Sequence, residues 1–547
     1  MRGGKFESLR VEKCMPGKYR WASVGDVNSF FGLMLDNIAG LFLLVSLLSQ
    51  VFQFPVEFVL RYMIPGTAIG VLIGDLAFFL LALQLAKKTG STTVTAMPLG
   101  LDTPSTFGMI FFVLGPAYQL ALKGGMEAHA AAMHAWQIGI CCIFISGIFK
   151  LICSFGSDWI RRSIPRAGLL GSLAAIALVI ISFLPLLEIL HYPMVGLIAM
   201  SIILTALVGR VPLPFKLPGA VGGLVVAGGI FGIMHVAGLL GPSEPPAFNP
   251  SAGLWPTEWL QALSFDWWSA MGHTVKYIPI VIPFAIATIV GGIDCAESAS
   301  AVGDHYSTGS VIGIEAIATL LASLCGAVIQ TTPYIGHPAY KAMGGRAAFT
   351  LATAIAFGLL GTTGLFGYFY LLIPKATVYP ILMFVGLEIS AQSFLATPRR
   401  HYPAVAMACV PALAFLAMFF VGPETKVTPA IITTGLLKNG FILTSVFWSS
   451  ALALVIDRRL NAAAVFYFAA AFCTLFGVIH SPLPSAPLLL PLAIPGIPES
   501  LILPAEHYST VMNWTMGYFI VGCLMLLWDF YLKVTHQSAP DPDHLQD

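Results

Sequence analysis

Two stretches of the chain decide its fold: MPLGLDTPSTFG at residues 97–108 and QTTPYIGHPAYKAMGG at residues 330–345. Each lies in an apolar region, yet each carries proline and glycine where a helix needs an unbroken ladder of backbone hydrogen bonds. In hydrocarbon, such a backbone persists only where it is buried in protein or lines a wet cavity. We therefore predict two broken membrane spans with a ligand site between them.

The composition around these stretches excludes a soluble protein. Of the 547 residues, 57% are hydrophobic and only 10% are charged, whereas soluble domains carry about 25% charged residues. The 27 Lys and Arg residues nearly balance the 26 Asp and Glu residues, so a basic nucleic-acid-binding protein is not expected. We predict an all-α polytopic membrane protein, embedded in the lipid bilayer.

About 16 hydrophobic segments follow one another, at roughly 20 residues for each crossing. They start near residues 28, 64, 104, 130, 166, 191, 218, 274, 308, 331, 347, 376, 403, 438, 461 and 508. Seven precede the polar loop around residues 241–268, and the broken segment is the third on each side of it. An odd number of spans in each set gives the sets opposite orientations, which indicates an inverted repeat.

The predicted organisation has both termini in the cytoplasm. Alternating loops place 21 of the 27 Lys and Arg residues inside, as the positive-inside rule requires. We expect a cytoplasmic N-terminal segment (1–27), a first repeat of spans 1–7 (28–241), an external loop (242–270), a second repeat of spans 8–14 (271–459), two extra C-terminal spans (460–533) and a cytoplasmic tail (534–547). The basic residues thus indicate an even number of crossings in a multi-pass protein, and we expect a bacterial inner membrane.

The densest group of acids in an apolar span is GGIDCAESASAVGDHY at residues 291–306. Asp294 and Glu297 are three residues apart and so share one helix face. Acids within a span are costly and therefore candidates for function: one can bind a polar solute while the other titrates. Asp304 and His305 lie nearer the inner surface, where a cap or loop role is expected.

The second broken segment supplies polar groups for a flat ligand. Thr331, Thr332, Tyr334 and His337 can all form hydrogen bonds with it, and a half-helix is expected to start near Gly336 or His337. His337 can also titrate near neutral pH, although a buried histidine is as often a satisfied core residue.

The first broken segment and the first span supply three more candidates. Asp102, followed by Thr103 and a proline, reads as a helix cap that can also contact substrate. Asp36 lies in the middle of the first span, where a cross-helix hydrogen bond and a role in ion coupling are both open.

These motifs resemble the nucleobase–cation symporter-2 superfamily, the xanthine/uracil permeases, over about residues 20–460. The stretch GDVNSFFGLMLDNIAGLFLLVSLL at residues 25–48 is similar to the opening span of the adenine/guanine/hypoxanthine permease branch. Residues 291–306 and 330–346 resemble the eighth-span and tenth-span signatures. The resemblance implies 14 core spans in two inverted repeats of seven, a core and a gate domain, broken third and tenth spans built from a short strand and a half-helix, and often a homodimer.

The resemblance also implies roles for individual residues. Asp294 matches the acid that binds substrate or couples transport in the purine branch. The second acid of the family falls on Gly336, with His337 beside it, and Glu297 is a candidate replacement. We therefore expect a secondary active transporter for a nucleobase-like solute of the purine, xanthine or uracil class, driven by H⁺ or Na⁺ symport, with Glu297, His337 or Asp36 carrying the coupling charge.

Three alternatives remain beside this transporter: a carrier of another solute, a channel, and a membrane-embedded enzyme or receptor. Sulfate- and bicarbonate-type carriers share the fold, so a carrier of a small organic or inorganic anion is the alternative. An enzyme is not expected, because the chain has no HExxH, GxxxxGK[ST] or GxSxG motif and no His/Cys cluster with zinc spacing. No metal site and no cofactor beyond the coupling ion is predicted.

Overall fold

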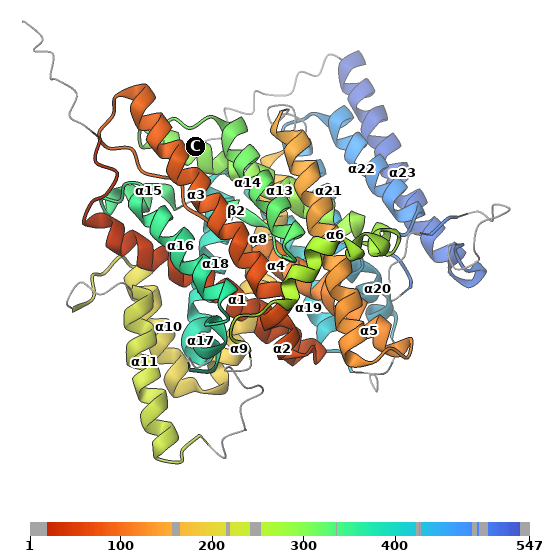
Figure 1. Cartoon of the computed structure of the whole chain (residues 1–547). Coiled ribbons are helices and arrows are strands. Elements are labelled where there is room, and N and C mark those ends of the chain that lie inside the picture. Colours follow the sequence, from red (N-terminus) through yellow and green to blue (C-terminus); the bar gives the residue numbers. More distant parts are fainter. Residues whose placement is uncertain are drawn as a thin grey trace, which may run out of the picture.

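Apolar helices account for most of the chain, as the composition predicts (Figure 1). The computed structural model describes residues 19–155, 165–214, 219–240, 253–334, 336–372, 375–422, 426, 428–483, 489–491 and 502–535. Much of the predicted N-terminal segment, external loop and C-terminal tail, and most of the proline-rich connection before residue 502, lie outside these residues.

The described part of the expected first repeat consists of helices and one short strand. Its elements are α1 (Gly25–Phe52), α2 (Val56–Phe58), η1 (Val59–Met63), α3 (Ile64–Thr89), β1 (Leu99–Leu101), α4 (Thr103–Met109), η2 (Ile110–Leu114), α5 (Gly115–Lys123), α6 (Ala128–Ser154), α8 (Arg166–Ile176), η3 (Ala177–Ser182), α9 (Phe183–His191), α10 (Pro193–Leu207) and α11 (Gly219–Val236). The π-turns η1, η2 and η3 join neighbouring helices into continuous spans.

Short 3₁₀ turns and then the second repeat follow. The elements are η6 (Glu258–Ser264), η7 (Asp266–Ala270), α12 (Met271–Thr274), η8 (Val275–Tyr277), α13 (Ile278–Ala301), α14 (Thr308–Leu324), β2 (Thr331–Pro333), α15 (His337–Ala342), α16 (Ala348–Thr362), α17 (Phe366–Leu372), α18 (Lys375–Leu395), η9 (Arg399–His401), α19 (Tyr402–Phe419), α20 (Pro429–Lys438) and α21 (Phe441–Ile456). The expected external loop therefore contains local helical structure in its second half.

Many of these helices are long enough to cross a bilayer. Within the described residues, nine are long and apolar enough, or up to eleven if each of two bent pairs is one span. The bent pairs are α16 with α17, at 85°, and α20 with α21, at 84°. The protein is therefore an integral, multi-pass membrane protein, as predicted.

The packing of the helices displays the inverted repeat. Helix α3 packs against α16, and the equivalent helices α14 and α6 pack against each other. The contact between α19 and α8 is matched by the contact between α10 and α18. The contact between α21 and α8 is matched by the contact between α11 and α18. Each contact recurs with the partners from the two repeats exchanged, so the halves are related by a pseudo-two-fold axis.

Two sets of helices emerge from this packing. We call α1, α3, α4, α6, α13, α14, α15 and α16 the core helices, and α8, α9, α10, α11, α18, α19, α20 and α21 the gate helices. Glycines let the core helices approach closely: a Cβ on Gly66 of α3 would overlap the backbone carbonyl of Cys325, which follows α14.

The two added helices lie outside the repeat. Helices α22 (Leu460–Leu475) and α23 (Ala505–Val534) pack against each other at one edge of the bundle, and α22 contacts α21 (Figure 1). Their main contacts are with each other and with α21, away from the two broken segments.

Candidate functional site

The two broken segments meet at the centre of the core helices. Strands β1 and β2 pair antiparallel, with Leu99 opposite Pro333, Gly100 opposite Thr332 and Leu101 opposite Thr331. Both breaks thus take the predicted form of a short strand followed by a half-helix.

Buried polar side chains satisfy the backbone that the breaks expose. The Asp75 carboxylate accepts a hydrogen bond from the Leu99 amide at 3.0 Å, and the Asn37 side-chain oxygen accepts one from the Leu101 amide at 3.0 Å. In hydrocarbon an unpaired amide costs several kcal/mol of free energy, so these two acceptors stabilise the broken backbone. Asp75 had no predicted role, and the structure supplies one.

Each half-helix begins at a predicted signal. Asp102 caps α4 by accepting a hydrogen bond from the Ser105 amide at 2.8 Å, so the capping reading of Asp102 is confirmed. Helix α15 begins at His337, immediately after Gly336. A Cβ at residue 336 would overlap the Tyr334 ring, so Gly336 leaves room for that ring.

A cavity of about 140 Å³ lies between the strands, α13 and the gate helices. Three carboxylates line it: Asp36 on α1, Asp102 before α4 and Asp294 on α13. Leu170 of α8 and Val385 of α18 lie on the gate side. The remaining lining residues are Leu101, Thr103, Pro104, Leu173, Ala287, Thr288, Gly291, Cys295, Thr332, Pro333, Tyr334, Ile389, Gln392, Ser393 and Ala396.

Six of the nine predicted site residues therefore lie at one cavity. They are Asp36, Asp102, Thr103, Asp294, Thr332 and Tyr334. Their common position does not test their roles, which stay predictions, but it brings together residues from four separate parts of the chain.

Three predicted residues do not line the cavity. Alternation along β2 turns Thr331 away from Thr332 and towards Thr319, whose hydroxyl lies 3.3 Å from its own. Glu297 is 40% exposed and lies 3.0 Å from the Arg166 guanidinium. His337 is fully buried, with Nε2 2.9 Å from the Asp304 carboxylate, and its contact with a ligand stays a prediction.

Asp304 organises the connection between α13 and α14. Its carboxylate accepts the Thr95 amide at 3.2 Å and pairs with Lys341 at 2.7 Å in addition to His337. Burial raises the pKa of Asp304, but the hydrogen bonds from His337, Lys341 and Thr95 outweigh it, and the net pKa is lowered. Asp304 therefore lies in a loop, as expected, and also links Thr95, just before the first broken segment, to His337 and Lys341 of the second.

Sequence reasoning missed two charge pairs. Lys150 is one of the 21 Lys and Arg residues that the alternating loops place inside, but its side chain is fully buried and its ammonium lies 2.7 Å from the equally buried Glu315 carboxylate. The same ammonium donates to the Thr331 carbonyl at 3.4 Å, so the pair supports β2 from behind. The sequence did contain a signal for this pair, because Lys150 and Glu315 are each a single charged residue within an apolar span.

Arg166 forms the second missed pair. Its guanidinium lies 3.0 Å from Glu297 and 3.8 Å from Asp294, and is 33% exposed. Because Arg166 begins α8, it extends from the gate helices to the core helix α13.

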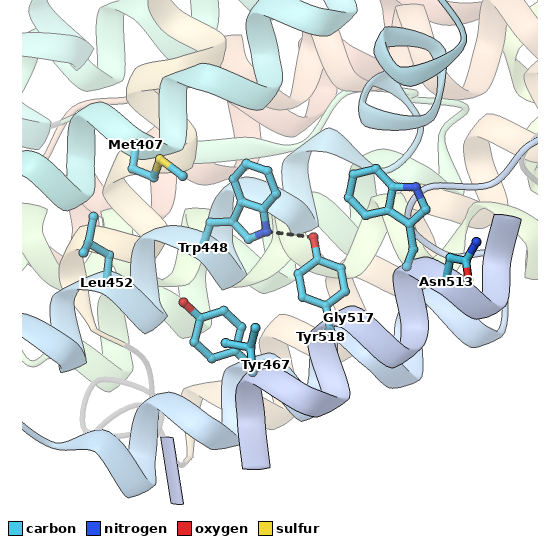
Figure 2. Close-up of a pocket in the computed structure, with 9 residues that line it drawn as sticks. Met407, Trp448, Leu452, Tyr467, Asn513, Gly517 and Tyr518 are labelled. Carbon is cyan, nitrogen blue, oxygen red and sulfur yellow. Dashed lines mark hydrogen bonds between the residues drawn. The ribbon is translucent and has the colours of Figure 1, made fainter. Parts of the chain in front are cut away.

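A larger cavity, about 550 Å³, lies elsewhere (Figure 2). Aromatic side chains from α21, α22 and α23 line much of it, and the Trp448 indole donates to the Tyr518 hydroxyl at 2.8 Å. None of its described lining residues comes from a broken segment. The smaller cavity is therefore the candidate site, because the broken spans and the acids converge there.

Comparison with solved structures supports the fold. No protein-family model and no curated protein sequence matches the chain. The chain is similar to the structure of SLC26A9, with a TM-score of 0.50 and 11% identity over 80% of this chain and 65% of that one. It is also similar to the transmembrane domain of the cyanobacterium bicarbonate transporter BicA, with a TM-score of 0.46 and 14% identity over 73% of this chain and 97% of that one. The likeness to SLC26A9, at that low identity, bears on the fold alone.

The chain has the 7+7 inverted-repeat fold predicted from its sequence. The particular branch suggested by the motifs stays a prediction.

Proposed function

We propose that this protein is a secondary active transporter that moves a small, neutral, nucleobase-like solute across the membrane by symport with H⁺ or Na⁺. The observation that carries the proposal is the acid-lined cavity at the meeting point of both broken spans, between the core and gate helices. A midplane site between such elements is the arrangement on which alternating access operates.

The polar lining favours a solute rich in N–H donors. Carboxylates accept hydrogen bonds only, and Asp36, Asp102 and Asp294 all border the cavity. Among its described lining residues, none is Lys, Arg or His. A neutral heterocycle with ring and exocyclic N–H groups matches such a set, whereas an anion would meet three acceptors of its own charge sign.

The apolar lining favours a flat solute. Leu170, Leu173 and Val385 approach from the gate side, and Tyr334 supplies an aromatic ring from the core side. At about 30 Å³ for each water of the liquid, 140 Å³ corresponds to about five waters, which is room for one small solute.

In the proposed cycle, the solute N–H groups donate to Asp294 on α13. Asp36, from the opposite repeat, replaces His337 as the candidate for the coupling charge, because Asp36 borders the cavity and His337 does not. The gate helices then move relative to the core helices around this site, so that the cavity opens to one side at a time.

One observation favours a second candidate, a small anion. The Arg166 guanidinium lies 3.8 Å from Asp294, so a cation stands at the edge of the cavity. An anion carrier would use Arg166 as its counter-charge and would need the acids neutralised.

A thermal-shift screen of the purified protein separates the two candidates. Uracil, xanthine, hypoxanthine, adenine, bicarbonate and sulfate are each tested with and without Na⁺. A ligand at 100 times its Kd stabilises the folded state by about 2.7 kcal/mol, which such an assay detects. Stabilisation by anions alone would refute the nucleobase proposal.

The Asp294→Asn variant then tests the site. It keeps the shape but turns one acceptor oxygen into a donor, so we expect the nucleobase shift to disappear and uptake to fall at least tenfold, while the protein still reaches the membrane. Asp529→Asn, which alters a pair with the exposed Lys533 on α23, away from the cavity, is the matched control and should behave as wild type. Wild-type transport by Asp294→Asn would remove that residue from the mechanism.

A further inference from the structure

Arg166 connects the two sets of helices at the edge of the cavity. Its Nη1 donates to the Ala396 carbonyl at 3.3 Å, just beyond the end of α18 in the gate. Its Nη2 reaches Glu297 at 3.0 Å and Asp294 at 3.8 Å, both on α13 of the core. A planar guanidinium with five donors can hold three such acceptors at once.

The position of this contact relates it to the inner end of the cavity. Arg166 is the first residue of α8, and the predicted topology places that end on the cytoplasmic side. Glu297 lies one helical turn beyond Asp294 towards the same end of α13. Ala396 itself lines the cavity. The bridge therefore lies between the cavity and the cytoplasm.

We propose that Arg166 is a positioning residue that ties the gate helices to Asp294 and Glu297, and so holds the cytoplasmic side of the cavity closed in this conformation. The idea rests on the proposed transport function, to which it adds the residue that links site and gate. At 3.8 Å, the Arg166 guanidinium attracts the Asp294 carboxylate from beyond hydrogen-bond distance. A solute that donates to Asp294 competes with Arg166, and the bridge loosens when the site fills.

Cys295 provides a native reporter of opening. It follows Asp294 on α13, lines the cavity, and is only 2% exposed. A thiol reagent that cannot cross membranes reaches it from the cytoplasm only when the inner side opens. Labelling is followed in inside-out vesicles by mass spectrometry of the peptide that contains Cys295, without any solute present.

The decisive variant is Arg166→Gln, tested with one cationic and one anionic methanethiosulfonate reagent. Because two partly exposed ion pairs are lost, we expect the labelling rate to rise roughly two- to thirtyfold with both reagents. Arg166→Lys keeps the charge but cannot hold three acceptors, and should give a smaller rise; it also serves if Arg166→Gln does not fold. The charge-exchanged pair Arg166→Glu with Glu297→Arg should return the rate towards that of wild type.

A matched control lies within the gate. Arg400 pairs with Asp457 at 3.1 Å, and both belong to the gate side, so Arg400→Gln should label like wild type. An unchanged rate in Arg166→Gln, an increase with the cationic reagent alone, or the same increase in Arg400→Gln would each overturn the proposal. Since no solute is used, a failed nucleobase screen would leave this result standing.

Discussion

The buried pair of Lys150 and Glu315 allows a quantitative prediction about stability. Both side chains are fully buried, and 2.7 Å separates the ammonium nitrogen from the carboxylate oxygen. With an effective dielectric constant of about 20, two unit charges at this distance attract each other by about 6 kcal/mol. Desolvation of both groups offsets most of that attraction, so the net contribution of the pair is small.

Removal of one partner has a different outcome from removal of both. Lys150→Met leaves the Glu315 carboxylate buried without its counter-charge, and we expect a loss of about 3–5 kcal/mol in the free energy of unfolding. In the double variant Lys150→Met with Glu315→Gln no charge remains, and we expect a free energy of unfolding within about 1 kcal/mol of the wild-type value. Lys150→Met also removes the donor to the Thr331 carbonyl, so β2 should be the element that loosens.

The assay is reversible unfolding in mixed micelles of rising SDS content, applied to wild type, both single variants and the double variant. Arg400→Gln is the control, because its pair is about one-third exposed on the arginine side and should contribute less than about 1 kcal/mol. If Lys150→Met were no less stable than the double variant, the argument that an uncompensated buried charge dominates would be refuted.

Two further predictions concern the core helices. Gly66→Ala places a methyl group against the Cys325 carbonyl and should cost about 1–3 kcal/mol, whereas Gly228→Ala on α11, with no atom within 4 Å, should be neutral or slightly stabilising in the same unfolding assay. Because the pKa of Asp304 is lowered in the folded protein, its carboxylate stabilises the folded state. This stabilisation is complete above the unfolded-state pKa of about 3.9, and it is lost as the pH falls through the lower folded-state pKa. Asp304→Asn should therefore melt below wild type at neutral pH, and the difference should narrow below about pH 4; a constant difference from pH 7 to pH 3 would contradict the assignment.

The breaks were predictable because their causes are local. Proline and glycine act through the backbone of their own residues, so residues 97–108 and 330–345 already indicate interrupted helices. The Asp102 cap was predictable for the same reason, since its partner is Ser105, three residues away. The repeat followed from counting apolar segments on each side of one polar loop.

The partners of the buried charges were not predictable in this way. Lys150 and Glu315 are 165 residues apart, and Arg166 and Glu297 are 131 apart, so only the packing of the helices brings them together. Reasoning from sequence placed Lys150 at the membrane surface because the positive-inside rule treats every cation alike. The pairing of His337 with Asp304, 33 residues earlier, was not predictable for the same reason.

The sequence alone determined that this chain is a multi-pass membrane protein with an inverted repeat and two broken spans, since composition, apolar length and proline position are properties of short segments. Only the tertiary structure decided which acids face the cavity and which serve the scaffold. Asp36, Asp102 and Asp294 border the cavity, whereas Asp75 and Glu315 support the strands. The physical reason is that a carboxylate within a membrane must find a donor or a counter-charge, and the fold, not the local sequence, determines which one lies within reach.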